Sequence, residues 1–295
     1  MQKYITEFQK MIEIRSLTES TLKSYTGYLK EYLTYIENQL NKDANQVTWE
    51  ELREYVLHLK KNKLLNPRTI NAHISQLRFL TLYVLRKPWD CYQVPYLKFD
   101  TKLPYILSQE KTHYFISSME NLKYKAIIAL IYSSGLRVSE ACELNYDDIS
   151  RKNMTIRIRR SKNRSERYAI LSKNALTILT EYWQKYNKPK DWLFPSTQKP
   201  GYPIVPETVN SFIKDHKEKL GWESQIITSR TFRHCFGSHL YENGVDIIAI
   251  KNALGHKSIN STMIYVHVNA DKQNSVISPF DNNLICKQID LMQDE

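Results

Sequence analysis

Four short segments of this 295-residue chain carry side chains that could act together on a phosphate group. The first, GLRVSE, contains an arginine and a glutamate, and the second, RRSKNRSER, reads as the basic tip of a hairpin. The third and fourth segments are SRTFRHCFGSHL and LGHKSINSTMIYVHV. Guanidinium groups donate several hydrogen bonds to a phosphate, and a helix N-terminus already attracts anions. The candidate residues are Arg137, Glu140, Lys162, Arg230, Arg233, His234, His256 and Tyr265.

Each segment taken by itself also fits a purely structural role. Arg137 could simply pair with Glu140 at the start of a helix. Lys162 occupies a hairpin turn, where most lysines only face water. Tyr265 is one of 20 tyrosines, and a single tyrosine usually serves packing. Only the combination of the four segments, in their order and spacing, is specific.

Taken in order, the arginine, the hairpin lysine, the Arg-His pair, the LGH triplet and the tyrosine resemble the catalytic domain of tyrosine recombinases and phage-type integrases. The resemblance covers nearly the whole chain, and the short overall length looks Xer-like. It implies that Tyr265 attacks a DNA backbone phosphate covalently and that Lys162 is the general acid. A phenol with a pKa near 10 leaves more readily than an alkoxide, so the tyrosyl link conserves bond energy for rejoining.

The resemblance also assigns the groups around the phosphate. Arg137 and Arg233 match the two phosphate-clamping arginines of the family, and fixed cations stabilise the charge of a pentacoordinate transition state without a metal. His256 matches a later His or Trp that hydrogen-bonds the phosphate or packs beside it, and Glu140 would buttress Arg137. We therefore expect no metal and no nucleotide cofactor.

One position departs from the family pattern. The third segment usually reads HxxR, with the His thought to be the acid/base for the tyrosine, but here the matching residue is Arg230. An arginine cannot accept the proton of Tyr265 at neutral pH, although it could bind the phosphate as a third cation. Water or His256 would then accept the proton. His234 is another candidate, although helix geometry directs it about 100° away from Arg233.

The spacing of apolar residues predicts a mainly α fold with one small β-hairpin. Residues 1–90 read as a helical bundle, which the resemblance implies is a core-binding, SAM-like domain. Its apolar stripes contain Leu22, Tyr25, Leu29, Leu33, Ile36, Ile70, Ile74, Leu77 and Val84. Residues 91–108 bear prolines without periodicity and read as a linker. Residues 109–272 would form the catalytic domain. In residues 273–295, Ile285, Ile289 and Met292 would share one face of a tail helix, which could also pack on its own domain or be frayed.

The formal net charge of +11 and the pI near 9.3 favour a polyanionic partner. Candidate DNA contacts are Lys23, Lys60, Lys61, Arg68, Arg78, Arg160 and Arg164, each of which could equally be a solvated surface charge. We expect a cytoplasmic protein, because the sequence has neither a membrane-spanning apolar run nor a secretory signal. The four cysteines are read as reduced and mostly buried, without the spacing of a zinc site.

The family resemblance implies double-stranded DNA with inverted half-sites as the partner. One site would bind a homodimer, and a homotetramer joined through the tails would form the synapse. A monomeric type IB topoisomerase and a catalytically impaired DNA-binding protein remain as alternatives. The sequence does not reveal the target site, the need for accessory proteins, or whether the reaction resolves chromosome dimers or moves a mobile element.

Overall fold

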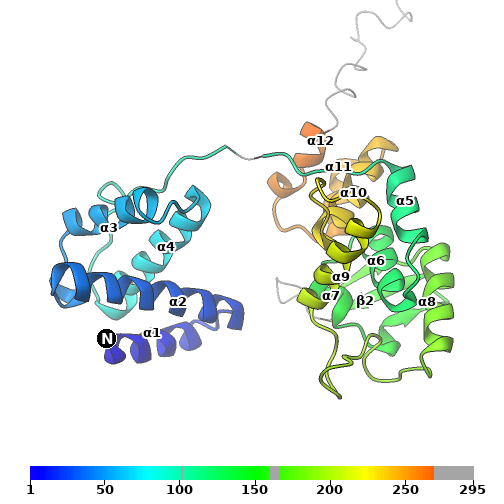
Figure 1. Ribbon diagram of the computed structural model, residues 1–295, viewed down its shortest axis with the longest axis horizontal. Helices are drawn as coiled ribbons and strands as arrows, with labels where there is room; N and C mark the ends of the chain where they lie inside the picture. Colours follow the sequence, from blue (N-terminus) through cyan, green and yellow to red (C-terminus); the bar gives the residue numbers. More distant parts are fainter. Residues whose placement is uncertain (101, 160–165, 269–295) are drawn as a thin grey trace, which may run out of the picture. The chain divides into compact units, whose positions relative to one another are not determined.

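The computed structural model describes residues 1–100, 102–159 and 166–268 of the chain. They fall into two units, Met1–Thr101 and Lys102–Glu295, each with its own hydrophobic core (Figure 1). Most of the regular structure is helical, and the described strands form one small sheet. The structure confirms the predicted class, mainly α with a small β-sheet.

The N-terminal unit is a helical bundle. Its elements are α1 Gln2–Ile14, α2 Glu19–Tyr35, η1 Ile36–Leu40, η2 Ala44–Gln46, α3 Trp49–Lys61, α4 Pro67–Phe79 and η3 Leu80–Val84. The side chains of Thr18 and Asn66 cap α2 and α4, and a reciprocal capping box between Thr48 and Glu51 opens α3. Of the apolar stripes predicted from the sequence, Leu29, Leu33, Ile36, Ile70, Ile74 and Leu77 are buried in the core. Leu22, Tyr25 and Val84 are partly buried against it.

The chain between the two units is anchored at both of its ends. Leu97 exchanges hydrogen bonds with the side chain of Asn71 on α4, at 2.8 and 3.0 Å, and Val94 is buried in the core of the N-terminal unit. Leu107 is buried in the core of the C-terminal unit. The proline-bearing stretch therefore belongs to the N-terminal unit as far as Leu97 and to the C-terminal unit from Leu107.

The C-terminal unit surrounds one apolar helix. Its elements are α5 Gln109–Ser117, α6 Leu122–Ser134, α7 Val138–Cys142, η4 Tyr146–Asp148, β1 Ile149–Ser150, β2 Thr155–Ile158, β3 Arg167–Ile170, α8 Lys173–Lys185, α9 Pro206–Lys219, α10 Ser229–Glu242, α11 Ile247–Leu254, η5 Ile259–Ser261 and α12 Ile264–Val268. Every residue of α6 from Ala126 to Ile131 is buried, and α6 packs against α8 and α10. This explains why its sequence is apolar all round. It ends at Gly135, whose φ of +62° suits the left-handed cap.

The sheet is antiparallel, in the order β1-β2-β3. Ile156 pairs with Ala169, and both side chains face the core, while the neighbouring Arg157 and Tyr168 are exposed. The predicted hairpin corresponds to β2 and β3. The sequence analysis missed β1, because two residues are too few to display an alternating pattern.

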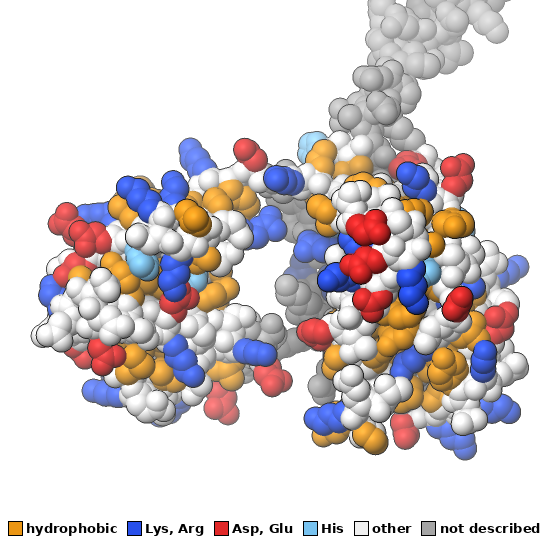
Figure 2. Space-filling model, viewed as in Figure 1, with side chains coloured by type: hydrophobic (Ala, Val, Ile, Leu, Met, Phe, Trp, Pro, Cys, Tyr) orange, Lys and Arg blue, Asp and Glu red, His pale blue; other side chains and the backbone are white. Residues whose placement is uncertain are grey.

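The described cysteines are free thiols, but they are not alike. Cys142 and Cys235 are buried as expected, whereas Cys91 is exposed because it lies in a turn of the inter-unit chain. Cys286 lies outside the described residues. No helix in the described part is both long and apolar enough to cross a bilayer. Figure 2 shows cationic and acidic side chains intermixed over the visible surface of each unit.

Candidate active site

A buried carboxylate organises the first part of the site. Glu140 on α7 accepts from the guanidinium of Arg137 at 2.7 Å and from the backbone N–H of Arg137 at 2.9 Å. The guanidinium of Arg167 on β3 donates to the same carboxylate at 2.8 Å. Burial acts to raise the pKa of Glu140, but Arg167 and the hydrogen bonds from Arg137 outweigh it and hold that pKa below the usual range. Glu140 is therefore an anion that fixes the Arg137 guanidinium.

Arg233 on α10 joins the same cluster from the other side. Its Nη1 donates to the carbonyl of Gly135 at 2.5 Å and its Nη2 to the carbonyl of Leu254 at 2.7 Å. These carbonyls lie at the C-terminal ends of α6 and α11, which attract cations. Arg233 also lies 3.9 Å from Glu140. Burial, with the nearby Arg137, lowers the pKa of Arg233 to about 10, so it remains charged at neutral pH.

His256 follows Gly255, the left-handed cap of α11, and borders this cluster. Its Nδ1 lies 2.9 Å from the hydroxyl of Thr262. Burial, and then the charges of Arg233 and Arg137, lower the pKa of His256 to about 4. The imidazole is therefore neutral at physiological pH and keeps a lone pair for hydrogen bonding.

Tyr265 on α12 is almost completely buried, with 1% of its surface exposed. Its ring lies against Gly237 of α10, so closely that a Cβ at that position would be 2.5 Å from the ring. Its hydroxyl is 3.2 Å from Nδ1 of His234. Burial raises the pKa of Tyr265 to about 12 against the opposing pull of Arg233 and Arg230. The unreacted residue is a neutral phenol.

Arg230 does not contact the arginine cluster but reaches His234. Its Nε–H donates to Nε2 of His234 at 3.2 Å, one helical turn along α10. Burial, and then Arg230 and Arg233, lower the pKa of His234 to about 4, so its ring is neutral. A neutral imidazole has only one N–H, so Nδ1 must carry the proton and donate to the Tyr265 oxygen. The structure thus aligns Arg230, His234 and Tyr265 in one chain of hydrogen bonds.

The structure brings together the predicted residues Arg137, Glu140, Arg233 and His256, and separately Arg230, His234 and Tyr265. Lys162 lies outside the described residues, as do Arg160 and Arg164. The remaining candidates for DNA contact are all exposed on the N-terminal unit, and they are Lys23 on α2, Lys60 and Lys61 on α3, and Arg68 and Arg78 on α4. The guanidinium of Arg68 also stacks over Phe99.

Sequence reasoning missed two residues of this site. Arg167 shares the carboxylate of Glu140, although nothing in the segment ERYAIL distinguishes it from a surface arginine at a strand start. Gly237 provides the flat surface under Tyr265, and a glycine in the interior of a helix is the signal that could have indicated a close contact.

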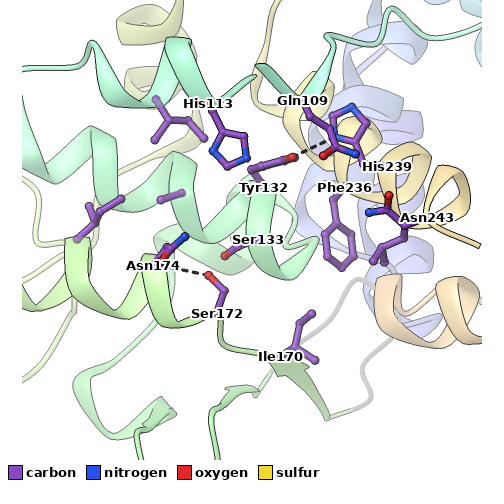
Figure 3. Close-up of a pocket in the computed structure, with 15 residues that line it drawn as sticks. Gln109, His113, Tyr132, Ser133, Ile170, Ser172, Asn174, Phe236, His239 and Asn243 are labelled. Atoms are coloured by element: carbon purple, nitrogen blue, oxygen red, sulfur yellow. Dashed lines mark hydrogen bonds between the residues drawn. The ribbon is translucent and has the colours of Figure 1, made fainter. Parts of the chain in front are cut away.

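A separate pocket of about 340 Å³ opens between α5, α6, α8 and α10 (Figure 3). Its lining is mostly apolar and includes Ile116, Ala175, Ile178 and Leu240. At one side Tyr132 and His239 are hydrogen-bonded at 3.0 Å, as the dashed line in Figure 3 marks. None of the predicted catalytic residues lines this pocket.

Comparison with known proteins matches both units. The family model described as the phage integrase family matches residues 106–272, and the phage integrase N-terminal SAM-like domain matches residues 4–91. A putative integrase/recombinase of Sinorhizobium fredii, y4qK, is 33% identical over 275 residues, which are 92% of this chain and 88% of that protein. The tyrosine recombinase XerD of Rickettsia bellii is 28% identical over 90% of this chain and 94% of its own length.

A solved structure has the same fold. The XerH site-specific recombinase, crystallised with its difH substrate before cleavage, superposes with a TM-score of 0.71 over 94% of this chain and 84% of that chain, at 21% identity. The names of the matched relatives favour recombination over the topoisomerase and non-catalytic alternatives. With a family model over more than half of its length and a relative above 30% identity across nearly all of it, the chain belongs to the phage integrase family and is a tyrosine site-specific recombinase.

Proposed function

We propose that this recombinase cuts and rejoins DNA through Tyr265, without a metal or nucleotide. The tyrosine oxygen attacks a backbone phosphorus, an O–P bond to the tyrosine forms, and the bond to the 5′ oxygen breaks. The strand keeps a 3′-phosphotyrosyl link, and the departing 5′ oxygen takes up a proton. Attack by a 5′ hydroxyl on this link reverses the step and joins the strand to a new partner.

The observation that carries the proposal is the convergence on α10 of three other parts of the chain, which are the start of α7, the turn after α11, and α12. Arg233 meets Arg137 through Glu140, and Tyr265 meets His234 one residue further along the same helix. A phosphate held by the two arginines would lie close to Tyr265, since the charge of Arg233 already acts on the pKa of that phenol. Two fixed guanidiniums supply the charge stabilisation that the transition state requires.

We assign a gating role to Arg230. While its Nε–H occupies Nε2 of His234, Nδ1 of that ring holds a proton and cannot accept another. When a phosphate enters the site, the exposed side chain of Arg230 turns to it and serves as the third cation. This movement releases Nε2 of His234. A change of tautomer then leaves Nδ1 able to take the Tyr265 proton. Burial and then the charges of Arg230 and Arg233 hold the pKa of His234 at about 4, and the phosphate offsets the part due to the arginines.

The test uses nicked suicide duplexes carrying a candidate site, in EDTA, with the denaturation-resistant adduct as readout. The wild type should form the adduct and Tyr265→Phe should not. His234→Asn keeps an amide N–H near Nδ1 but cannot accept a proton, so it should be as slow as His234→Ala, by about 10²-fold or more. Imidazole should partly rescue His234→Ala. A wild-type rate in His234→Asn would overturn the role of proton acceptor, and an adduct in Tyr265→Phe would overturn the nucleophile.

Lys162 is proposed as the general acid for the 5′ oxygen. The test compares an ordinary duplex with one whose scissile bridging 5′ oxygen is replaced by sulfur, because a thiolate leaves without protonation. Lys162→Ala should be slow on the first substrate and near the wild-type rate on the second. Equal slowing on both substrates would remove Lys162 from this role and leave it as a phosphate contact.

We propose duplex DNA with inverted half-sites as the partner, bound by residues 1–90 and by the catalytic residues 109–272, with residues 91–108 connecting the two. The charge of +11 and the similarity in fold to XerH, which was crystallised bound to its difH substrate, support this proposal. We propose that the reaction takes place in the cytoplasm. Each lost phosphate contact among Lys60, Lys61 and Arg68 should reduce the slope of log affinity against log salt by about 1. An unchanged slope in Ala variants would exclude the residue concerned.

We further propose that a dimer occupies one site and a tetramer forms the synapse through residues 273–295. We propose that Ile285, Ile289 and Met292 of this tail dock in the mostly apolar pocket of Figure 3 on a neighbouring protomer. Ile289→Asp should preserve binding of one protomer to a half-site and weaken paired-site complexes in gel shifts. Ala175→Arg in the pocket should do the same. Paired-site complexes of wild-type strength in both variants would contradict this docking.

A further inference from the structure

Arg167 is the first residue of β3, and its side chain turns inward to the active site. It is 13% exposed, and its Nη2 donates to Oε2 of Glu140 at 2.8 Å. Its Nη1 donates to the carbonyl of Ala253, near the end of α11, at 3.0 Å. One side chain therefore connects β3, the second strand of the hairpin, to α7 and to α11.

Arg167 also fixes the turn that leads to His256. Gly255 has a φ of +63°, and a Cβ built there would be 2.7 Å from both Cδ and Nε of Arg167. The guanidinium end of Arg167 thus lies directly against the glycine of the LGH triplet. Gly255 is required for two reasons, since its backbone is left-handed and the space beside it is filled by this arginine.

The contacts of Arg167 are made within the protein. Each of its Nη atoms already donates to a protein oxygen, and its Nε is buried without a hydrogen-bond partner. An unpaired buried donor is unfavourable, so this conformation does not maximise the hydrogen bonds of Arg167 itself. Arg167 instead binds Oε2 of Glu140 through its Nη2, so that Oε1 accepts from Nη1 of Arg137.

We propose that Arg167 is a positioning residue that sets the Arg137 guanidinium and the His256 turn relative to each other. The inference rests on the proposed function, in which both groups contact the scissile phosphate. Without Arg167, Oε2 of Glu140 keeps the backbone N–H of Arg137 but loses the guanidinium at 2.8 Å. The less compensated carboxylate then attracts the Arg137 guanidinium more strongly and draws its donors away from the phosphate. The peptide of Gly255 also loses its support.

The test measures DNA affinity and the single-turnover rate of adduct formation separately, at saturating nicked duplex. Arg167→Met should leave affinity within about twofold and slow the adduct by about 10²-fold, as expected for a displacement of about 1 Å at the reacting centre. Arg167→Lys, which keeps one charge on Glu140, should recover part of the rate. Arg151→Met is the control, because Arg151 donates at 3.1 Å to the hydroxyl of Thr180 on α8, outside the cluster and outside the four candidate segments. That variant should keep the wild-type rate.

Two further measurements separate positioning from general instability. Gly255→Ala should slow the adduct, and the slowing should be smaller in an Arg167→Ala background, because part of the clash is removed. In NMR spectra the imidazole C–H signals of His256 should shift in Arg167→Met and stay in place in Arg151→Met, whether or not the protein is active. Should Arg167→Met fail to fold, Arg167→Lys and Gly255→Ala give the same comparison.

The outcomes are distinct for the two proposals. A wild type that forms no adduct contradicts the proposed function, while the His256 signals still report on Arg167. A folded Arg167→Met with the wild-type adduct rate, or one that loses DNA affinity at an unchanged saturated rate, overturns the positioning role.

Discussion

The contact between Gly237 and Tyr265 gives the sharpest prediction. An alanine Cβ at position 237 would lie 2.5, 2.6 and 2.9 Å from three carbons of the tyrosine ring. Ordinary carbon contacts begin near 3.5 Å, so the ring must move by about 1 Å. The ring cannot yield easily, because it is 1% exposed and packs in a cluster with Ile250 and Leu254.

The stability cost of Gly237→Ala should be modest. Overpacking a core costs about 1–3 kcal/mol, while alanine in a helix interior gains about 1 kcal/mol over glycine. We therefore expect a net loss of about 0–2 kcal/mol. The chemical step should suffer more, since a displacement of about 1 Å at a reacting atom lowers the rate by about 10²-fold.

The assay is single-turnover adduct formation on the nicked duplex, combined with denaturant unfolding and DNA affinity. Gly27→Ala is the control, because Gly27 lies in α2 and a Cβ there meets nothing within 4 Å. That variant should gain about 0.5–1 kcal/mol and keep the adduct rate. A folded Gly237→Ala with an unchanged rate would refute the reasoning, since it would mean that the Tyr265 ring leaves this surface before it reacts.

Three further predictions concern stability and pH. Gly135→Ala should lower the free energy of unfolding in urea by about 2–4 kcal/mol, because φ is +62° and a Cβ would lie 2.5 Å from a buried ring. Gly201→Ala, with φ of +81° and open space, should cost only about 1 kcal/mol. Equal losses in the two variants would contradict this account. His234 and His256 have pKa values lowered to about 4 from an ordinary 6.5, so the stability they contribute is present above pH 6.5 and is lost as pH falls towards 4. Thermal unfolding from pH 7 to 4 checks this, and Asn variants should flatten the profile. Because the pKa of Tyr265 is raised to about 12 and that of His234 is lowered to about 4, neither group changes protonation between pH 7 and 9, so the adduct rate should stay level over that range. A tenfold rise per pH unit would mean that hydroxide, and not His234, takes the phenol proton.

Local signals in the sequence were sufficient to predict most of the fold. Thr18 as a cap and the apolar run of α6 are encoded within a few residues, so the helices they define could be predicted without tertiary information. The spacing of Arg137 and Glu140 likewise places both at one helix start. Local sequence patterns do not specify how segments that are distant in the sequence are oriented relative to one another.

Arg167 illustrates that limit. Its inward direction depends on the register of β2 and β3, and its partner Glu140 lies on another element, so no short pattern reveals the contact. His234 is similar. Helix geometry directs it away from Arg233, but only the docking of α12 beside α10 brings the Tyr265 hydroxyl to it. The exposure of Cys91 also follows from a turn that composition alone does not specify.

The central claim is that a DNA phosphate becomes covalently attached to Tyr265. The most direct measurement is to trap the adduct on a nicked duplex, digest both the protein and the DNA, and locate the nucleotide remnant by mass spectrometry. We predict a peptide spanning IYVHV whose Tyr265 carries a phosphate joined to the 3′ end of the cleaved strand. A remnant on another residue, or one joined through a 5′ end, would contradict the account.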